Sequence, residues 1–157
     1  MQLDYNLPER FDLTYIDEND DRVRPVMIHR APFGSLERFI GVMIEHTGGN
    51  FPLWLAPTQV KVLPITDAQN DYAHGVARDL QAAGFRVETD TRSEKVGRKI
   101  RDAEVEKVPV MLVVGGKEAE AGTVAVRRHG QGDVGTAATA ELAGTLRDEV
   151  SRQLGRA

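Results

Sequence analysis

Between residues 60 and 114 the sequence alternates between short apolar runs and longer amphipathic stretches. The short runs, which are read as strands, are Val60–Ile65, Phe85–Thr89 and Val110–Val114, and the last of them is apolar throughout. The stretches between them carry apolar residues at helical spacing, which is the pattern of a helix with one buried face. Strands connected by helices in this way pair in parallel, and continuous apolar runs are typical of strands covered on both faces. The alternation therefore predicts an α/β fold with a mixed, mostly parallel sheet flanked by helices.

Capping and breaking residues mark the ends of the two predicted helices. We expect Asp67 to cap the first helix and Gly84 to end it. The second helix is predicted over about residues 94 to 106, and Pro109 stops it. Each helix has an apolar line to place on the sheet, formed by Tyr72, Val76, Leu80 and Ala83 in the first and by Val96, Ile100 and Ala103 in the second.

The chain after Val114 completes the same module. A turn at 117–122 should allow the strand Thr123–Arg128 to pair with the strand before it. The glycine-rich segment Gly130–Gly135 is predicted to be a loop. A closing helix follows, with an apolar line formed by Leu142, Leu146, Val150 and Leu154. We assign residues 56–157 to this complete α/β module, which leaves residues 1–55 as part of another domain.

The first fifty-five residues read as strands followed by one amphipathic helix. Gln2–Asn6 is predicted as a short strand, and an acidic turn at 17–21 should join strands at 13–16 and 23–30. Ser35 is a natural N-cap for the helix, which Gly48 and Gly49 end. Its apolar face consists of Leu36, Phe39, Ile40, Met43 and Ile44. The segment 51–57 is interpreted as an ordered connector that Trp54 holds in place.

Charge and composition exclude several classes of function. The net charge of −4 argues against a general polyanion binder, so we expect no DNA partner, and any RNA contact must come from a local basic patch. The chain has no cysteine, which excludes disulfides and thiolate metal sites. No apolar stretch approaches the ~20 residues of a membrane span, and the N-terminus lacks the pattern of a signal peptide. We therefore expect no membrane partner and a cytoplasmic location.

The run HRAPFGSLERFIGVMIE at residues 29–45 resembles motif 3 of the class II aminoacyl-tRNA synthetases. Among these enzymes, the motif of the threonyl family is the most similar. Further matches to this family are QLDYNLPERF at 2–11, FPLWLAP at 51–57, RSEKVGRKIR at 92–101, GGKE at 115–118 and VR at 126–127. The resemblance covers nearly the whole chain. It implies that residues 1–55 end a class II catalytic domain with an antiparallel sheet, and that residues 56–157 form an anticodon-binding domain.

The resemblance assigns nucleotide-binding roles to three residues of the first segment. Arg38 matches the motif 3 arginine that contacts ATP, where a planar cation suits both ring stacking and phosphate charge. Gln2 and Ser35 match further positions of the ATP site. Without the resemblance, Arg38 would be read as a solvated helix residue paired with Glu37 or Glu45.

His29 matches a zinc-binding histidine of the threonyl family. In that family the zinc coordinates the amino group and the hydroxyl of threonine, which valine cannot imitate. The other ligands of the family site, a Cys and a His, match no residue of this chain. A single imidazole cannot hold zinc at useful affinity, so we expect zinc and Mg-ATP to bind the full-length parent and neither to bind this chain tightly.

A basic stretch at the predicted second helix is the best candidate for RNA contact. It comprises Arg92, Lys95, Arg98, Lys99 and Arg101, with Glu94, Asp102 and Glu104 interleaved, so a solvated helix face is the alternative. The stretch follows a strand, at the edge of the sheet where open α/β sheets bind ligands. By resemblance, Ser93, Glu118 and Arg127 read anticodon bases, and Lys95 and Arg98 support them. The family often has Asn at the position of Ser93.

The resemblance implies the C-terminal portion of an ATP-dependent ligase that joins threonine to tRNA. This portion would recognise the anticodon stem-loop of the threonine tRNA and supply Arg38, whereas ATP and threonine bind the parent, which is expected to be a homodimer. The chain alone is predicted to be inactive because class II motifs 1 and 2 are not in it. The alternative is a free-standing tRNA- or protein-binding module derived from such an enzyme.

Overall fold

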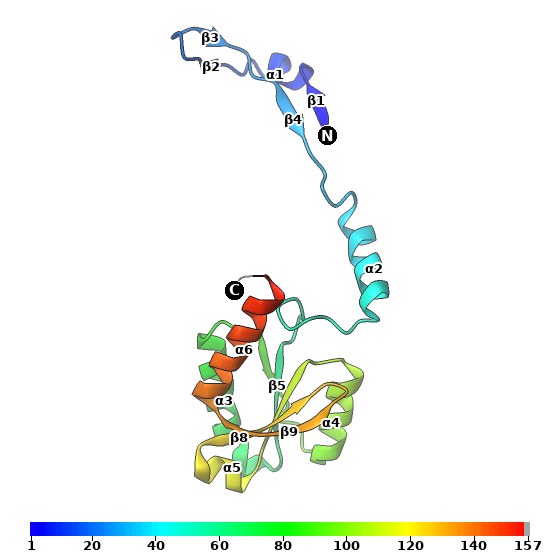
Figure 1. Ribbon diagram of the computed structural model, residues 1–157, viewed down its shortest axis with the longest axis vertical. Coiled ribbons are helices and arrows are strands. Elements are labelled where there is room, and N and C mark those ends of the chain that lie inside the picture. Colours follow the sequence, from blue (N-terminus) through cyan, green and yellow to red (C-terminus); the bar gives the residue numbers. More distant parts are fainter. Residues whose placement is uncertain (156–157) are drawn as a thin grey trace. The chain divides into compact units, whose positions relative to one another are not determined.

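The computed structural model describes residues 1–155, which divide into two compact units (Figure 1). The first unit is Met1–Met43, and the second begins at Ile44 and contains the rest of the described chain. This division reflects how the residues pack. The boundary expected after residue 55 concerns the two sequence modules and stays a prediction.

A five-stranded mixed sheet forms the centre of the second unit, in the order β6-β5-β7-β8-β9 (Figure 1). Its strands are β5 (Val60–Pro64), β6 (Val87–Thr89), β7 (Val110–Val114), β8 (Thr123–Arg128) and β9 (Gly132–Ala138). β5 pairs in parallel with both β6 and β7, whereas the pairs β7–β8 and β8–β9 are antiparallel. The predicted α/β architecture with a mixed sheet is confirmed.

Helices cover both faces of this sheet (Figure 1). On one face, α3 (Asn70–Ala82) and α6 (Thr139–Gln153) bury Leu80 and Leu146 against Val60, Val62 and Leu112. On the other face, α4 (Val96–Val105) buries Ala103 against Leu63 and Met111. Successive strand residues point to opposite faces, so one apolar run supplies both layers. This double burial explains why β7 reads as a continuous apolar run and why β5 is apolar except at Lys61.

Two predicted elements of the second unit are wrong. The expected turn after β7 is the short helix α5 (Gly116–Ala121), whose first turn is closed because the Gly115 backbone N–H donates to Glu118 Oε2 at 2.9 Å. A helix this short is too brief to show a period in the sequence. The expected loop at 130–135 lies largely in β9, where pairing with β8 overrides the low strand propensity of glycine.

Two local details also differ from the expectation. Thr66, rather than Asp67, is the N-cap of the 3₁₀ turn η1 (Asp67–Gln69) that leads into α3. In the connector before β5, Leu53 and Ala56 are buried, each at 2% exposure, whereas Trp54 is 38% exposed. The Leu53 carbonyl accepts from Gln59 Nε2 at 2.7 Å, and the Trp54 carbonyl accepts from Arg86 Nη2 at 2.8 Å. Leu53, Ala56 and these backbone contacts therefore hold the connector, while the Trp54 ring is only partly covered.

The first unit contains two small antiparallel sheets. β1 (Gln2–Asp4) pairs with β4 (Met27–His29), and β2 (Tyr15–Ile16) pairs with β3 (Arg22–Val23) across the predicted acidic turn. That turn is stabilised because Asp17 Oδ1 accepts from the backbone N–H groups of Asn19 and Asp21. A short helix, α1 (Asn6–Arg10), begins where the first strand was expected to end.

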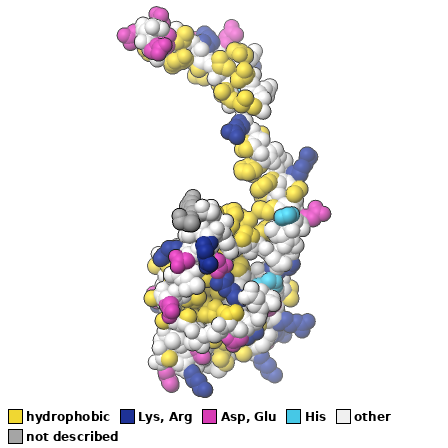
Figure 2. All heavy atoms as spheres, viewed as in Figure 1, with side chains coloured by type: hydrophobic (Ala, Val, Ile, Leu, Met, Phe, Trp, Pro, Cys, Tyr) yellow, Lys and Arg dark blue, Asp and Glu magenta, His cyan; other side chains and the backbone are white. Residues whose placement is uncertain are grey.

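The helix α2 (Leu36–Thr47) forms as predicted, but none of its residues is buried. Leu36, Phe39, Ile40 and Ile44 are between 41% and 62% exposed. The first unit likewise exposes Tyr5, Phe11, Ile16 and Ile28, and Figure 2 shows apolar side chains on its surface and along α2. No helix in the described residues is long and apolar enough to cross a membrane.

Candidate functional site

A hollow of about 370 Å³ lies where the parallel strands β5 and β6 end. One wall is the segment Ile65–Asp67, which follows β5, and the other is the segment Arg92–Lys95, which connects β6 to α4. Both walls begin at the carboxyl ends of parallel strands, which is the usual ligand-binding edge of an open α/β sheet. Of the residues predicted to contact RNA, Ser93 and Lys95 line this hollow.

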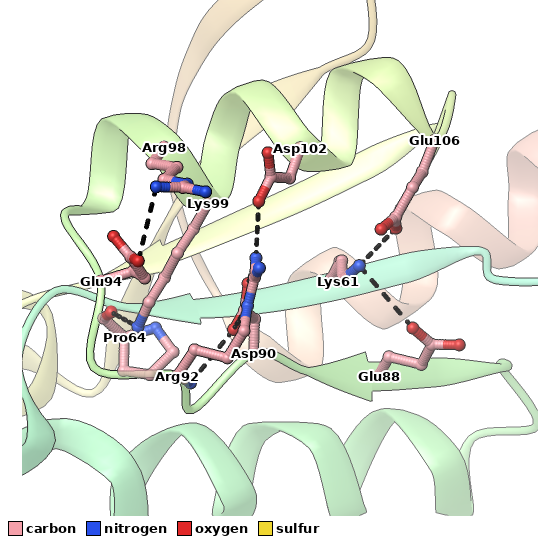
Figure 3. Close-up of polar contacts among 10 residues, drawn as sticks. All are labelled: Lys61, Pro64, Glu88, Asp90, Arg92, Glu94, Arg98, Lys99, Asp102 and Glu106. Carbon is pink, nitrogen blue, oxygen red and sulfur yellow. Dashed lines mark hydrogen bonds and ion pairs between the residues drawn. The ribbon is translucent and has the colours of Figure 1, made fainter.

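Arg92 does not point freely into the hollow, because it joins two carboxylates (Figure 3). Its Nη2 lies 2.6 Å from Asp90 Oδ2 and 2.9 Å from Asp102 Oδ2, and its Nε donates to Asp90 Oδ1 at 2.9 Å. The Arg92 side-chain hydrogen bond is the main cause that lowers the pKa of Asp90. In return, the bonds to Asp90 and Asp102 raise the pKa of Arg92. Arg92 therefore connects the β6 edge to α4.

Lys99 is also used inside the fold, which corrects the expectation that it belongs to an exposed basic face. Its side chain is 2% exposed, and Nζ donates to the Pro64 carbonyl at the end of β5 at 2.9 Å (Figure 3). A buried ammonium group needs such an acceptor, because desolvation of an unpaired charge is costly. Lys99 thus holds the first turn of α4 on the sheet edge and is part of the hollow's wall.

The remaining cations of α4 are exposed. Lys95 stands just before the helix, and its ammonium group has no hydrogen bond or ion pair with a described residue. Arg98 Nη1 lies 3.6 Å from Glu94 Oε1 (Figure 3). An exposed pair at that distance is weak and easily exchanged for another partner. Lys95 and Arg98, together with the exposed Arg101, are therefore available to a polyanion, and the predicted patch is smaller than the sequence suggested.

Glu118 lies on α5, close to the same edge of the sheet. A Cβ atom built on Gly115 would be 2.8 Å from both Glu118 Oε2 and Ile65 Cδ1, so Glu118 and Ile65 flank Gly115. Ile65 in turn lines the hollow. One carboxylate oxygen of Glu118 accepts from the Gly115 N–H, which fixes the side chain. Its other oxygen, Oε1, has no hydrogen bond with a described residue and can accept from a ligand.

Arg127 lies elsewhere, on β8. Val124 and Val126 belong to the core under α3 and α6, so the alternating Arg127 faces the opposite side of the sheet, next to Met111 of β7. Its Nε is buried without a hydrogen-bond partner among the described residues, and Nη1 is 3.9 Å from Asp133 Oδ2. The structure therefore does not place Arg127 in the hollow, but it leaves this guanidinium incompletely satisfied.

In the first unit, Ser35 and Arg38 come together at the start of α2. Ser35 Oγ accepts from the Arg38 backbone N–H at 3.3 Å and donates to Glu37 Oε2 at 2.6 Å, which lowers the pKa of Glu37. The Arg38 guanidinium has no hydrogen bond or ion pair with a described residue. Pairing with Glu37 or Glu45, the alternative reading of Arg38, is therefore absent from the described structure.

Gln2 and His29 lie directly opposite each other in the β1–β4 pair, so their side chains share one face. His29 Nε2 is 2.9 Å from Asp4 Oδ2, and a carboxylate partner of this kind commonly orients a metal-binding imidazole. The described residues contain no group of three or more His, Cys, Asp or Glu side chains that could hold a metal ion. The residues present therefore fit one ligand of a zinc site and do not make the site.

Three polar residues that line the hollow, Thr66, Asp67 and Glu94, were not predicted as functional residues. Asp67 was interpreted as a helix cap, but it lines the hollow together with Ser93. The signal was present in the sequence, because Asp67 follows a predicted parallel strand just as Ser93 does. Side chains that follow such strands meet at one edge of the sheet.

Comparison with protein families assigns both units. Residues 59–149 match the anticodon binding domain, and residues 1–47 match the class II tRNA synthetase core domain of the G, H, P, S and T enzymes. The first match coincides with the five-stranded sheet and its helices. The second ends at the last residue of α2.

Two curated relatives named threonine–tRNA ligase match almost the whole chain. The threonine–tRNA ligase of Chlorobium chlorochromatii is 61% identical over 153 residues, which cover 98% of this chain and 23% of the relative. That of Phocaeicola vulgatus is 54% identical over 156 residues, covering 99% of this chain and 24% of the relative. The chain thus spans about a quarter of the length of these relatives.

Among solved structures, the RNA binding domain of threonyl-tRNA synthetase from Cryptosporidium parvum is similar, with a TM-score of 0.72 and 36% sequence identity. The similarity covers 94% of this chain and 38% of that one.

Proposed function

Because this chain belongs to the threonyl-tRNA synthetase family of class II enzymes, we propose that it is the portion of a threonine–tRNA ligase that recognises the tRNA anticodon. The observation that carries this proposal is the hollow at the sheet edge, which lies within the anticodon-binding match and has unpaired polar groups on its walls. RNA loops with unstacked bases are the ligands that such hydrogen-bonding edges recognise.

The residues of the second unit divide into two roles under this proposal. Lys95 and Arg98 are exposed cations that hold backbone phosphates, so they contribute affinity for any RNA. Ser93, Glu118 and Arg127 are the base-reading groups. Ser93 can donate or accept, Glu118 accepts with its free oxygen, and Arg127 uses the buried Nε that lacks an acceptor.

We also propose that the first unit supplies part of an ATP site in a longer protein. Arg38 is the catalytic contact, since its guanidinium is free for stacking and phosphate contact, and Ser35 holds the turn from which it projects. Gln2 completes the set on β1. When Mg-ATP is bound, it supplies the phosphoanhydride that activates threonine.

His29 is the proposed zinc ligand of that longer protein. Asp4 occupies the Nε2 side of its ring, which leaves Nδ1 to coordinate a metal. Zinc, when present, would select threonine by binding its hydroxyl. A homodimeric parent and a cytoplasmic location are further parts of this proposal.

The test of anticodon recognition is fluorescence anisotropy with a threonine anticodon stem-loop and a single-base variant, at two salt concentrations. Lys95→Ala and Arg98→Ala should weaken binding to both RNAs and reduce the salt dependence. Glu118→Ala and Arg127→Ala should each cost about 1–3 kcal/mol with the threonine anticodon and little with the variant. Equal losses for all four proteins on both RNAs would mean that this surface is electrostatic only. The net charge of −4 makes low salt the suitable starting condition.

A further inference from the structure

A second hollow, of about 270 Å³, lies at the opposite ends of β5 and β6, where these strands begin. Its walls come from the connector, from the turn between α3 and β6, and from α6. All of its lining residues belong to the second unit, and none of them has a role in the proposed RNA or ATP sites. It is therefore a candidate site for a different ligand.

Much of the wall of this second hollow is apolar. Trp54 and Leu154 are 38% and 40% exposed, and Phe85 is more deeply buried, at 8% exposure. Gln59 also lines the hollow, but both ends of its amide are bonded within the chain. Its Nε2 donates to the Leu53 carbonyl at 2.7 Å, and its Oε1 accepts a backbone N–H at 2.9 Å. A concave, mostly apolar surface with few polar groups is the usual form of a small-molecule site.

The backbone that carries the Trp54 ring is fixed on both sides. Its carbonyl accepts from Arg86 Nη2 at 2.8 Å, and its N–H donates to Gln153 Oε1 at 3.4 Å. Arg86 Nε also donates to the Ala56 carbonyl at 2.9 Å, which ties the connector to the start of β6. A ligand therefore does not have to order this segment when it binds.

The charge of the second hollow is positive, although the chain as a whole carries a net charge of −4. Arg86 and Arg147 line it, and no Asp or Glu of the described chain does. The connector carbonyls occupy Nε and Nη2 of Arg86. Arg147, on α6, is exposed, and its guanidinium has no hydrogen bond or ion pair with a described residue. One free guanidinium thus stands beside an apolar wall.

This combination selects the chemistry of the ligand. A guanidinium presents paired N–H donors that match the two oxygens of a carboxylate. An amine would meet two cations and no carboxylate in the lining. A polyanion such as RNA needs several free cations, and here only Arg147 offers its whole guanidinium.

We propose that the second hollow binds a small monocarboxylate with an apolar body. The carboxylate pairs with the Arg147 guanidinium, and the apolar body lies against Trp54, Phe85 and Leu154. This site goes beyond the proposed function and does not depend on it, because it lies at the other ends of the strands and uses different residues.

The experiment follows the fluorescence of Trp54, the single tryptophan of the chain, while the full chain is titrated with three probes. Cyclohexanecarboxylate, cyclohexylmethanol and cyclohexylmethylamine share one apolar ring and differ in charge. The carboxylate should give a saturable change in emission and bind about tenfold more tightly than the alcohol, as one charge-assisted hydrogen bond allows. The amine should bind more weakly than the alcohol.

Variants of α6 assign the effect to Arg147. Arg147→Gln should bind the carboxylate and the alcohol equally, and Leu154→Ala should weaken the binding of both. Arg152→Gln is the matched control, because Arg152 is exposed on the same helix and does not line the hollow. It should keep the tenfold preference. If Arg147→Gln melts at a lower temperature by circular dichroism, Arg147→Lys is the second variant, and it should restore the melt and keep part of the preference.

Four outcomes would overturn the proposal. They are no saturable change with the carboxylate, equal binding of the three probes by the unchanged protein, a preference that survives in Arg147→Gln, and a preference that is lost in Arg152→Gln. Competition between the carboxylate and an anticodon stem-loop would also count against it, since the hollow would then belong to the RNA surface. Loss of anticodon recognition alone would leave this site intact, so failure of the proposed function is distinguishable.

Discussion

Replacing Asp90 with Asn should lower the free energy of unfolding of the second unit by about 2 kcal/mol. The Asp90 side chain is 4% exposed and follows β6 at the edge of the sheet. Its Oδ1 accepts from the Arg92 backbone N–H at 3.1 Å and from Nε at 2.9 Å, and its Oδ2 accepts from Nη2 at 2.6 Å. An amide keeps one acceptor oxygen and turns a donor NH₂ toward the Arg92 guanidinium.

The size of this loss in unfolding free energy follows from the hydrogen bond that is removed and from the hydration of the Arg92 guanidinium that remains. One charge-assisted hydrogen bond contributes about 1.5–3 kcal/mol, and here it is replaced by two donors that face each other. The Arg92 side chain is 52% exposed, so water can hydrate the freed guanidinium, and the ~3–5 kcal/mol cost of an orphaned buried charge does not apply. Asp102→Asn is the control. Asp102 is 36% exposed and makes one contact with Arg92 at 2.9 Å, so its loss should cost below about 1 kcal/mol.

The effect should depend on pH in one direction. Hydrogen bonding to Arg92 lowers the pKa of Asp90 in the folded state, below the unfolded value of about 3.9. A lowered folded pKa contributes stability that is fully present above the unfolded pKa and is lost as the pH falls through the folded pKa. The difference between the unchanged protein and Asp90→Asn should therefore be constant from neutral pH down to about 4 and shrink below it.

Urea unfolding followed by the fluorescence of Trp54, the single tryptophan of the chain, measures this difference within the second unit. The midpoint should fall at neutral pH while the slope stays unchanged. Two results would refute the reasoning: a difference between the two proteins that is the same above and below pH ~4, or a cost for Asp102→Asn as large as that for Asp90→Asn.

Three further predictions test other parts of the structure. A fragment that begins at Ala56 should unfold cooperatively when followed by circular dichroism. A fragment that begins at Phe51 should be more stable by about 2 kcal/mol, because it retains the buried Leu53. Equal melting temperatures would show that Leu53 does not stabilise the core. Lys99→Met should cost about 1–3 kcal/mol in urea unfolding, because the Pro64 carbonyl loses its donor, whereas exposed Lys95→Met should cost less than about 0.5 kcal/mol. The purified chain should not catalyse threonine-dependent pyrophosphate–ATP exchange above a heat-treated control. In a full-length ligase, Arg38→Ala should raise the activation free energy of threonine activation by about 2–4 kcal/mol. An unchanged rate would exclude Arg38 from the ATP site.

Elements with a strong local period were predictable from the sequence. β7 is apolar over its whole length because both faces of the sheet are covered, and α3 and α4 repeat their apolar residues at the helical period. The short helix α5 and the strand β9 were not predictable in this way. α5 is too short to show a period, and β9 exists because β8 offers it a hydrogen-bonding partner.

The residues of the candidate site also divide into those that the sequence could predict and those that it could not. Ser93 and Lys95 could be assigned to the sheet edge because each follows a strand whose direction was predicted. The burial of Lys99 could not be predicted from the sequence, since Lys95 and Lys99 are identical residues one helical turn apart. What separates them is the Pro64 carbonyl under α4, which belongs to a strand thirty-five residues away in the chain.

The sequence by itself determined the family, the α/β architecture and the strand ends at which ligand-binding residues gather, because periodicity and motif order are local properties of the chain. Only the tertiary structure decided which charges remain available to a ligand. Arg92 and Lys99 are held by Asp90 and the Pro64 carbonyl, whereas the carboxylate of Asp67 has no hydrogen bond or ion pair with a described residue. Pairing of a charged side chain depends on which distant acceptor lies within reach, and that distance is set by the packing of α4 on the sheet.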